Sequence, residues 1–353
     1  MQGTRTVRSR KICFHFSVAT IAILACVGPA LSCQVPVFRF ALERWSSDQY
    51  EVSISSATST SVGDLFTTYE KGRTANLTLT TSNESNEIRV FRPRHPNKPV
   101  WKGPFNHENA AAVIDSPKRQ KLVEKILSGD SVVWIFLPGK DSQVNQTARE
   151  TLQSTMAIAR KDIQIPEGVV TSDEVTADNF SGDPEDIVDG DIPLKIDFSM
   201  LEVSREDPAE AVFIAMLLSV EDDLHDFSDS PMLFPAFGRG RVLEPLIGKG
   251  ITPDNLLTYC VYLCGACSCE VKDQNPGMDL LLATNWDAAD AATVTTATKA
   301  AEPKPETVHF NGEKSIPVAA AKSQLPRLPL IGLAMVLLLF GGLLFFKRGG
   351  EKQ

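Results

Sequence analysis

The chain has 353 residues, of which 43% are hydrophobic and 22% charged, values typical of a globular protein of about two domains with a sizeable core. Its formal net charge of −9 argues against nucleic acid as a partner, because no basic face is available to neutralise phosphates. Acidity by itself indicates solubility and names no partner.

Residues 1–32 have the pattern of a secretory signal peptide. Basic residues come first, the apolar stretch Phe14 to Val27 follows, and Gly28-Pro29 breaks it before the small-x-small sequence Ala30 to Ser32. The alternative is an uncleaved membrane helix, but the apolar run is short and interrupted. We therefore expect cleavage before Cys33.

Cys33 would then be the first residue of the mature chain, which makes it a candidate for lipid attachment. Bacterial lipoprotein signals favour leucine three residues before the cysteine, whereas this chain has Ala30 there. The alternative is an ordinary thiol or a disulfide partner, and both interpretations stay open.

Residues 33–129 predict an α/β domain. Four segments have the character of strands, and a helical stretch interrupted at Ser116-Pro117 follows them. The expected strands are Tyr50–Ser55, Asn76–Thr81, Glu87–Phe91 and Pro99–Lys102, the last two as a hairpin, and the helical stretch is Asn109–Leu127.

Residues 130–286 predict a second α/β domain in the order strand, helix, strand, helix, strand, strand, helix. The strands are Ser131–Leu137, Leu194–Val203, Met232–Phe237 and Val242–Ile247, and the helices are Gln143–Arg160, Asp207–Val220 and Asp254–Leu263. Thr252 is the expected N-cap of the last helix, with Pro253 at its first position and Gly265 at its end.

This order, with Ser230-Pro231 placed before a strand and a glycine-turned hairpin, resembles the thioredoxin fold. The resemblance implies a mixed-sheet α/β domain over residues 130–286 and a cis peptide bond before Pro231, a bond type nearly confined to proline. Residues 33–129 are expected to be either a degenerate second copy of this fold or an unrelated α/β segment.

Thioredoxin chemistry needs two cysteines at the N-terminus of the first helix, where the helix dipole lowers a thiol pKa. Here the strand containing Trp134 is followed by Pro138 to Gln143, which includes no cysteine. Dithiol exchange at the site implied by the resemblance is therefore excluded.

An acidic loop spans residues 169–191, inside the second domain. Its carboxylates lack the alternating spacing and the closing glutamate of an EF-hand calcium loop. We therefore expect a solvated loop.

Four cysteines fall within ten residues near the end of the second domain: Cys260, Cys264, Cys267 and Cys269. Structural disulfides are the default in an oxidising compartment. A zinc or copper(I) thiolate site and a reactive dithiol are the alternatives, although the spacing is too compact for a common zinc site and the CxxC lies at a helix C-terminus.

The C-terminal part of the chain predicts a membrane anchor. Residues 287–327 have the Ala/Thr/Pro-rich composition of a flexible linker, and residues 328–346 are apolar, uncharged and long enough to span a bilayer. Lys347 and Arg348 begin the tail, residues 347–353, and the positive-inside rule places it in the cytoplasm. A buried core helix is the alternative for residues 328–346.

No common catalytic or nucleotide-binding motif is present, so we expect no catalytic residue and no cofactor. His95, His107 and His225 fall near expected loops and are interpreted as surface residues. The sequence thus favours a non-enzymatic, single-pass extracytoplasmic protein, periplasmic if bacterial, that binds a protein partner in the envelope. The alternative is a thiol-redox or metal-handling protein that uses the Cys260–Cys269 cluster.

Overall fold

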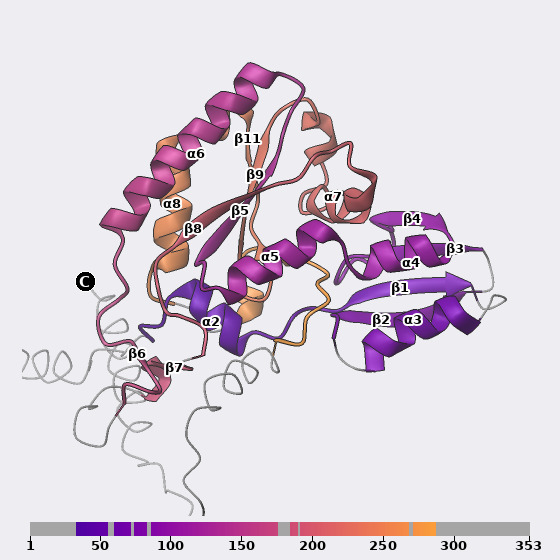
Figure 1. The fold of residues 1–353 in the computed structure, drawn as a ribbon, viewed down its shortest axis with the longest axis horizontal. Coiled ribbons are helices and arrows are strands. Elements are labelled where there is room, and N and C mark those ends of the chain that lie inside the picture. Colours follow the sequence, from indigo (N-terminus) through magenta and orange to yellow (C-terminus); the bar gives the residue numbers. More distant parts are fainter. Residues whose placement is uncertain are drawn as a thin grey trace, which may run out of the picture. The chain divides into compact units, whose positions relative to one another are not determined.

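The computed structural model describes residues 33–55, 60–71, 74–82, 86–175, 184–189, 191–267 and 271–286. The segments expected to be signal peptide, linker, membrane helix and tail lie outside these residues, as does Cys269. No helix in the described ranges is both long and apolar enough to cross a membrane. Two mixed β-sheets, each with flanking helices, make up most of the described chain (Figure 1).

The first sheet has the strand order β2-β1-β3-β4. Its central strand β1 pairs in parallel with β2 and antiparallel with β3, and β3 pairs antiparallel with β4. The strands are β1 (Tyr50–Ser55), β2 (Leu77–Ser82), β3 (Glu87–Phe91) and β4 (Trp101–Pro104). All four strands and the β3–β4 hairpin are thus as predicted, within two residues at each end, whereas helix α3 (Thr60–Lys71), which connects β1 to β2, was not predicted.

Two helices follow this sheet, α4 (His107–Ile114) and α5 (Pro117–Leu127). The side chain of Asn106 caps α4 by accepting a hydrogen bond from the Asn109 N–H, and Ser116 caps α5 in the same way with the Arg119 N–H. Pro117 occupies the first turn of α5, where its missing N–H costs nothing. The interruption predicted at Ser116-Pro117 is therefore confirmed.

The second sheet has the order β8-β5-β9-β10-β12, and β11 also pairs with β9. Its strands are β5 (Val132–Leu137), β8 (Phe198–Glu202), β9 (Met232–Phe237), β10 (Arg241–Val242), β11 (Leu246–Ile247) and β12 (Met278–Asp279). Strand β5 is parallel to β8 and antiparallel to β9. All six residues of β5 are buried, and likewise all six of β9, as expected for central strands covered on both faces.

The predicted strand Val242–Ile247 is divided into β10 and β11, both antiparallel to β9. Pro245 lies between them and has no N–H to donate, so regular pairing is interrupted there. The turn from β9 to β10 uses Gly238 and Gly240, with φ of 57° and 86°.

Three helices follow strands of this second sheet in sequence. They are α6 (Ser142–Asp162), α7 (Ala211–Leu217), which follows the 3₁₀ turn Pro208–Glu210, and α8 (Pro253–Cys264). Helix α8 begins as predicted, with the Thr252 side chain accepting from the Asn255 N–H, and it ends at Gly265. Helices α6 and α8 lie side by side along one face of the sheet (Figure 1).

Helix α2 (Val37–Arg44), which was not predicted, packs against α8 and β9. Just before it, the chain forms an antiparallel bridge between Pro36 and Ala266, with the Val37 N–H donating to the Gly265 carbonyl at 3.0 Å. The start of the described chain thus lies against the second sheet, although the first sheet follows it in sequence.

The acidic segment is described in part. Two short strands, β6 (Val170–Thr171) and β7 (Ile187–Val188), pair in parallel, and residues 176–183 and 190 lie outside the described ranges. Asp173 and Glu174 are exposed, as expected of a solvated loop. Asp186 is buried instead, and its carboxylate accepts a hydrogen bond from the Gln34 N–H at 2.6 Å.

Strand β5 divides the apolar interior into two clusters. Val133, Ile135 and Leu137 point into a cluster that includes β1 side chains of the first sheet, such as Tyr50 and Val52. The alternate residues, among them Trp134 and Phe136, point into a cluster made with α2, α6 and α8. The two sheets therefore share one hydrophobic core.

The two sheets also share one topology. In each, a parallel pair joined by a helix is extended by two antiparallel steps, in the orders β2-β1-β3-β4 and β8-β5-β9-β10. The mixed α/β architecture is consistent with a thioredoxin-like fold.

Candidate functional site

The turn before α6 is where the thioredoxin resemblance would position a redox dithiol. Here Asp141 is the N-cap, and its carboxylate accepts hydrogen bonds from the N–H groups of Gln143 and Val144 at 2.8 and 3.1 Å. The Asn145 side chain closes the turn by accepting from the Gly139 N–H at 2.7 Å and donating to the Gly139 carbonyl at 2.8 Å. These polar side chains hold the backbone and supply no nucleophile.

A second loop, residues 229–231, packs directly on this turn. A Cβ atom at Gly139 would lie 2.3 Å from the Asp229 carbonyl oxygen, so glycine is required for the approach. The Lys140 N–H donates to that same oxygen at 3.0 Å. Arg205 fastens both loops, donating through Nε to the Pro138 carbonyl at 2.8 Å and through Nη2 to the Ser230 carbonyl at 3.2 Å. The space beside the turn is therefore filled by backbone.

The prediction of a cis peptide bond before Pro231 was wrong, because every peptide bond between described residues is trans. The trans backbone here is held at both ends of the loop. The Ser230 carbonyl accepts from Arg205, and the Pro231 carbonyl accepts from the Gly248 N–H at 2.9 Å.

Cys260 and Cys264 lie on the inner face of α8, one helical turn apart and buried against β5. Both are free thiols in this structure. Burial raises the pKa of Cys260 to about 12, an effect only partly offset by the nearby indole of Trp134. Burial and the neighbouring Cys260 also raise the pKa of Cys264, with Ser131 opposing them. Both thiols are thus protonated and unreactive near neutral pH.

Cys33 and Cys267 lie apart from this pair, where the N-terminal segment meets the end of α8. Both are buried, and the Cys267 N–H donates to the Val35 carbonyl at 2.9 Å. The Cys33 thiol faces the Glu185 carbonyl oxygen, 3.9 Å away. Lipid attachment at Cys33 stays a prediction.

Metal binding by the sulfur cluster has no support in the described part of the chain. No group of three or more His, Cys, Asp or Glu side chains there is placed to hold a metal ion.

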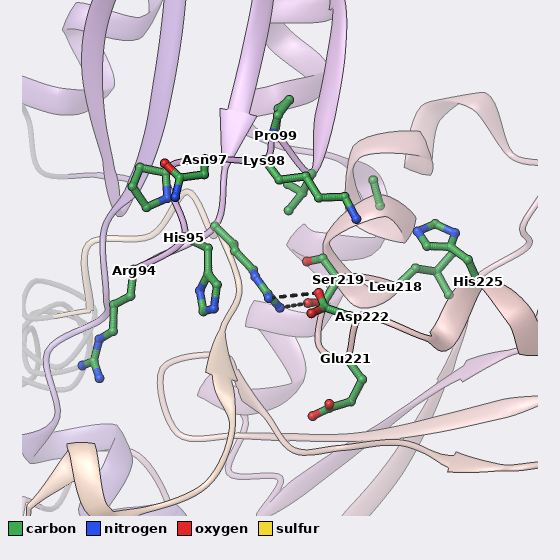
Figure 2. A pocket seen from close by; sticks show the side chains of 14 residues that line it. Arg94, His95, Asn97, Lys98, Pro99, Leu218, Ser219, Glu221, Asp222 and His225 are labelled. Carbon is green, nitrogen blue, oxygen red and sulfur yellow. Dashed lines mark hydrogen bonds and ion pairs between the residues drawn. The ribbon is translucent and has the colours of Figure 1, made fainter.

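A groove lies between the β3–β4 loop (residues 92–100) and the segment 215–225, which includes the end of α7. It consists of a cavity of about 370 Å³ and an adjoining cavity of about 340 Å³ that extends towards residues 273–278. Arg92, Arg94, His95 and Glu221 line both cavities, so the two lie next to each other, and we call them together the groove. Figure 2 shows the first cavity, with its two sides supplied by the two segments.

Arg92 connects the two sides of the groove. Arg92 donates through Nη1 to the Ser219 carbonyl and through Nη2 to Asp222 Oδ1 at 3.3 Å (Figure 2). Its side chain is largely buried, whereas that of Asp222 is 85% exposed, so solvent weakens the ion pair. The contact to the Ser219 carbonyl, just after α7, is therefore the stronger constraint.

Arg94 adopts a left-handed backbone conformation, with φ of 64°, and no other non-glycine residue in the described ranges has a positive φ. Strained residues of this kind gather at functional sites. The conformation directs the guanidinium away from the first cavity (Figure 2) to ion pairs with Asp273 and, at 3.7 Å, with Asp48.

A network of ion pairs borders the second cavity. Arg241 pairs with Asp279 at 2.9 Å, and both side chains are almost fully buried. Lys272 also binds Asp279 and reaches Asp48 at 2.9 Å. Because each charge has an opposite neighbour, this network fixes the groove without offering a vacant cation.

Carboxylates crowd one end of the groove. Glu221 has its pKa raised, first by partial burial and then by Glu244 and Asp223, while Arg92 opposes the shift.

A buried polar cluster behind the groove joins α4, α5 and the turn before α7. Arg119 and Glu210 are both fully buried. The Glu210 carboxylate accepts from the Ser116 hydroxyl at 2.6 Å and from the Lys118 N–H at 2.8 Å, at the N-terminus of α5. Arg119 Nη1 donates to the carbonyls of Val113 and Leu281 at 2.9 and 3.2 Å. The cluster thereby links the helices of the first sheet to elements of the second.

The sequence interpretation missed this groove. It treated His95 and His225 as surface residues, and both are indeed exposed, but it did not bring them to one site. The available signal was the stretch Arg92 to Pro99, in which three prolines alternate with basic and amide side chains. His107, by contrast, begins α4 and does not line the groove formed by residues 92–100 and 215–225.

Comparisons with protein families and with known proteins give no assignment for this chain. No family model, curated protein or solved structure matches it.

Proposed function

We propose that this chain is a non-enzymatic, membrane-anchored extracytoplasmic protein that binds a partner protein in the groove between residues 92–100 and 215–225. The observation that carries the proposal is the groove itself. It comprises two adjoining cavities, is partly apolar, and is bordered by exposed polar side chains, as recognition sites are.

The filled turn before α6 supports a role without redox turnover. Loop 229–231 occupies the side of this turn, and Gly139 is in backbone contact with it. The buried, protonated thiols of Cys260 and Cys264 oppose the alternative of a thiol-redox or metal-handling protein, because the thiolate is the reactive and metal-binding form.

The shared topology of the two sheets supports a tandem of thioredoxin-like units. In this proposal the first unit is a degenerate copy that has lost the helix between its second and third strands. The groove then lies where an element of one unit, the β3–β4 loop, meets the α7 segment of the other.

The anchor is the segment 328–346, with residues from Cys33 to the linker outside the membrane. This assignment is based on the apolar sequence of residues 328–346 and on the basic residues that follow it. A linker of residues 287–327 would let the groove reach partners at a distance from the bilayer.

The test is photo-crosslinking in cells that express the full chain. A photoreactive amino acid replaces Asn97, an exposed residue of the groove, or Gln164, an exposed residue after α6 that does not line it. We expect a crosslinked product of defined mass from position 97 and not from position 164, and no insulin reduction by the purified chain. Equal products from both positions, or catalytic reduction, would reject the proposed function.

A further inference from the structure

We propose that the groove recognises an extended acidic segment of the partner protein, with a carboxylate bound between Lys98 and His225 and an apolar residue on the floor beside it. The inference rests on the proposed partner-binding function and specifies its ligand.

Two nitrogen-bearing side chains face this end of the groove from opposite sides. Lys98 belongs to the β3–β4 loop and His225 to the segment after α7, and Figure 2 shows the lysine side chain extending towards the imidazole. No ion pair within the described ranges involves either residue, and both are exposed. Of the charged residues that line the same cavity, Asp222 pairs with Arg92, and Arg94 is engaged by Asp273. Lys98 can therefore bind a ligand carboxylate by its charge, and the His225 ring can donate a hydrogen bond to the same carboxylate.

Part of the first cavity is apolar. Val100, Ala215 and Leu218 line the first cavity, and two prolines of the loop, Pro96 and Pro99, complete it. A side chain such as leucine or valine would bury apolar area here without displacing a charge. The ligand therefore carries an apolar residue next to its carboxylate.

The shape of the groove favours a peptide over a small carboxylate. The two adjoining cavities, of about 370 and 340 Å³, share Arg92, His95 and Glu221 in their linings. Together they offer more space than a small carboxylate fills, and an extended chain can lie across both. Three prolines, Pro93, Pro96 and Pro99, fix φ along the loop that forms one side, so little conformational entropy is lost when a ligand binds.

A peptide selection followed by a double-mutant cycle tests the assignment. A randomised decapeptide library is selected on the full chain in detergent, and we expect enriched peptides to contain Asp or Glu beside Leu, Val or Phe. The best peptide is then compared with its Asn or Gln isostere on wild type and on the double variant Lys98→Gln/His225→Gln. Removing the carboxylate should weaken binding to wild type about tenfold, and to the double variant scarcely at all.

The controls separate recognition from folding. Lys161→Gln removes an exposed lysine of α6 outside the groove and should keep both the enriched motif and the affinity. Since Lys98 and His225 are exposed, the double variant should have the same Tm as wild type. An unchanged Tm would show that the loss of binding does not come from a loss of structure.

Three results would overturn the inference: enrichment of basic peptides, an equal isostere effect on wild type and the double variant, or competition by hexanoate as strong as by the peptide. The crosslink at Asn97 distinguishes this failure from that of the proposed function. If the double variant still gives that crosslink, the groove binds the partner but carboxylate recognition is wrong. If wild type gives none, the proposed function itself fails.

Discussion

Replacing Arg119 by methionine should strongly destabilise the protein. The Arg119 side chain is fully buried, and its guanidinium donates to the last carbonyls of α4, those of Ala112, Val113 and Ile114. It also donates to the Leu281 carbonyl at 3.2 Å, far away in sequence. Burial lowers the pKa of Arg119 to about 10, with Asp115 and Glu210 opposing the shift, so the group is still a cation at neutral pH.

The size of the stability loss follows from the buried carbonyl groups that lose their hydrogen-bond donor. Methionine fills a similar volume, so no large cavity forms, but several buried carbonyls become unsatisfied at about 1–3 kcal/mol each. The Glu210 carboxylate also loses its nearby positive charge while staying buried. Allowing for partial access of water to the α4 carbonyls, we expect a loss of about 4 kcal/mol in the free energy of unfolding, or about 10 °C in Tm.

Urea unfolding of the full chain in mild detergent measures this loss, with tryptophan fluorescence as the signal. Lys121→Met on the same helix is the matched control, because Lys121 is half-exposed and pairs only with Glu124 at the surface. It should change the free energy of unfolding by less than about 0.5 kcal/mol. If Arg119→Met costs less than about 1 kcal/mol, the buried cluster does not stabilise the contact between the two sheets as argued.

Three further outcomes are expected. In the folded chain at pH 8, iodoacetamide should leave Cys260 and Cys264 unmodified, because burial raises their thiol pKa values; mass spectrometry after alkylation, with and without urea, checks this. Asp197 has its pKa lowered below the ordinary 3.8, because hydrogen bonds from Arg160 and Lys195 outweigh its burial. Its contribution to stability is thus present above about pH 4 and lost as the pH falls further, so Asp197→Asn should flatten the acid limb of the stability curve. Protease added to intact cells or spheroplasts should release a soluble fragment that ends before residue 328, and protection of the folded part would contradict the membrane topology.

The central strands and the best-capped helix were predictable because their signals are local. β5 and β9 are uninterrupted apolar runs, and α8 has its N-cap, its first-turn proline and its terminal glycine in sequence. Helix α2 was not predictable in this way. It has only eight residues, too few for its periodicity to be distinctive, and Arg39 in its middle is buried, donating to the Ile192 carbonyl at 2.7 Å.

The groove escaped prediction for a different reason. Its two sides are more than a hundred residues apart in sequence, and neither segment is distinctive until the packing of the two sheets brings them together. The cis bond at Pro231 failed because it came from the resemblance alone. What decides that loop is its contact with Gly139 and Arg205, which element order does not reveal.

The left-handed conformation of Arg94 leads to a prediction in which two effects oppose each other. Arg94→Gly relieves a backbone strain of about 1 kcal/mol, whereas Arg94→Ala keeps that strain, and both remove the exposed ion pairs to Asp273 and Asp48. Glycine also gains entropy in the unfolded state, which offsets part of the relief. We expect Arg94→Ala to be less stable than Arg94→Gly by about 0.5 kcal/mol in urea unfolding, with both close to wild type, because solvent screens the lost ion pairs. If the alanine variant is the more stable, residue 94 is not strained, and the loop is held in shape by its three prolines alone.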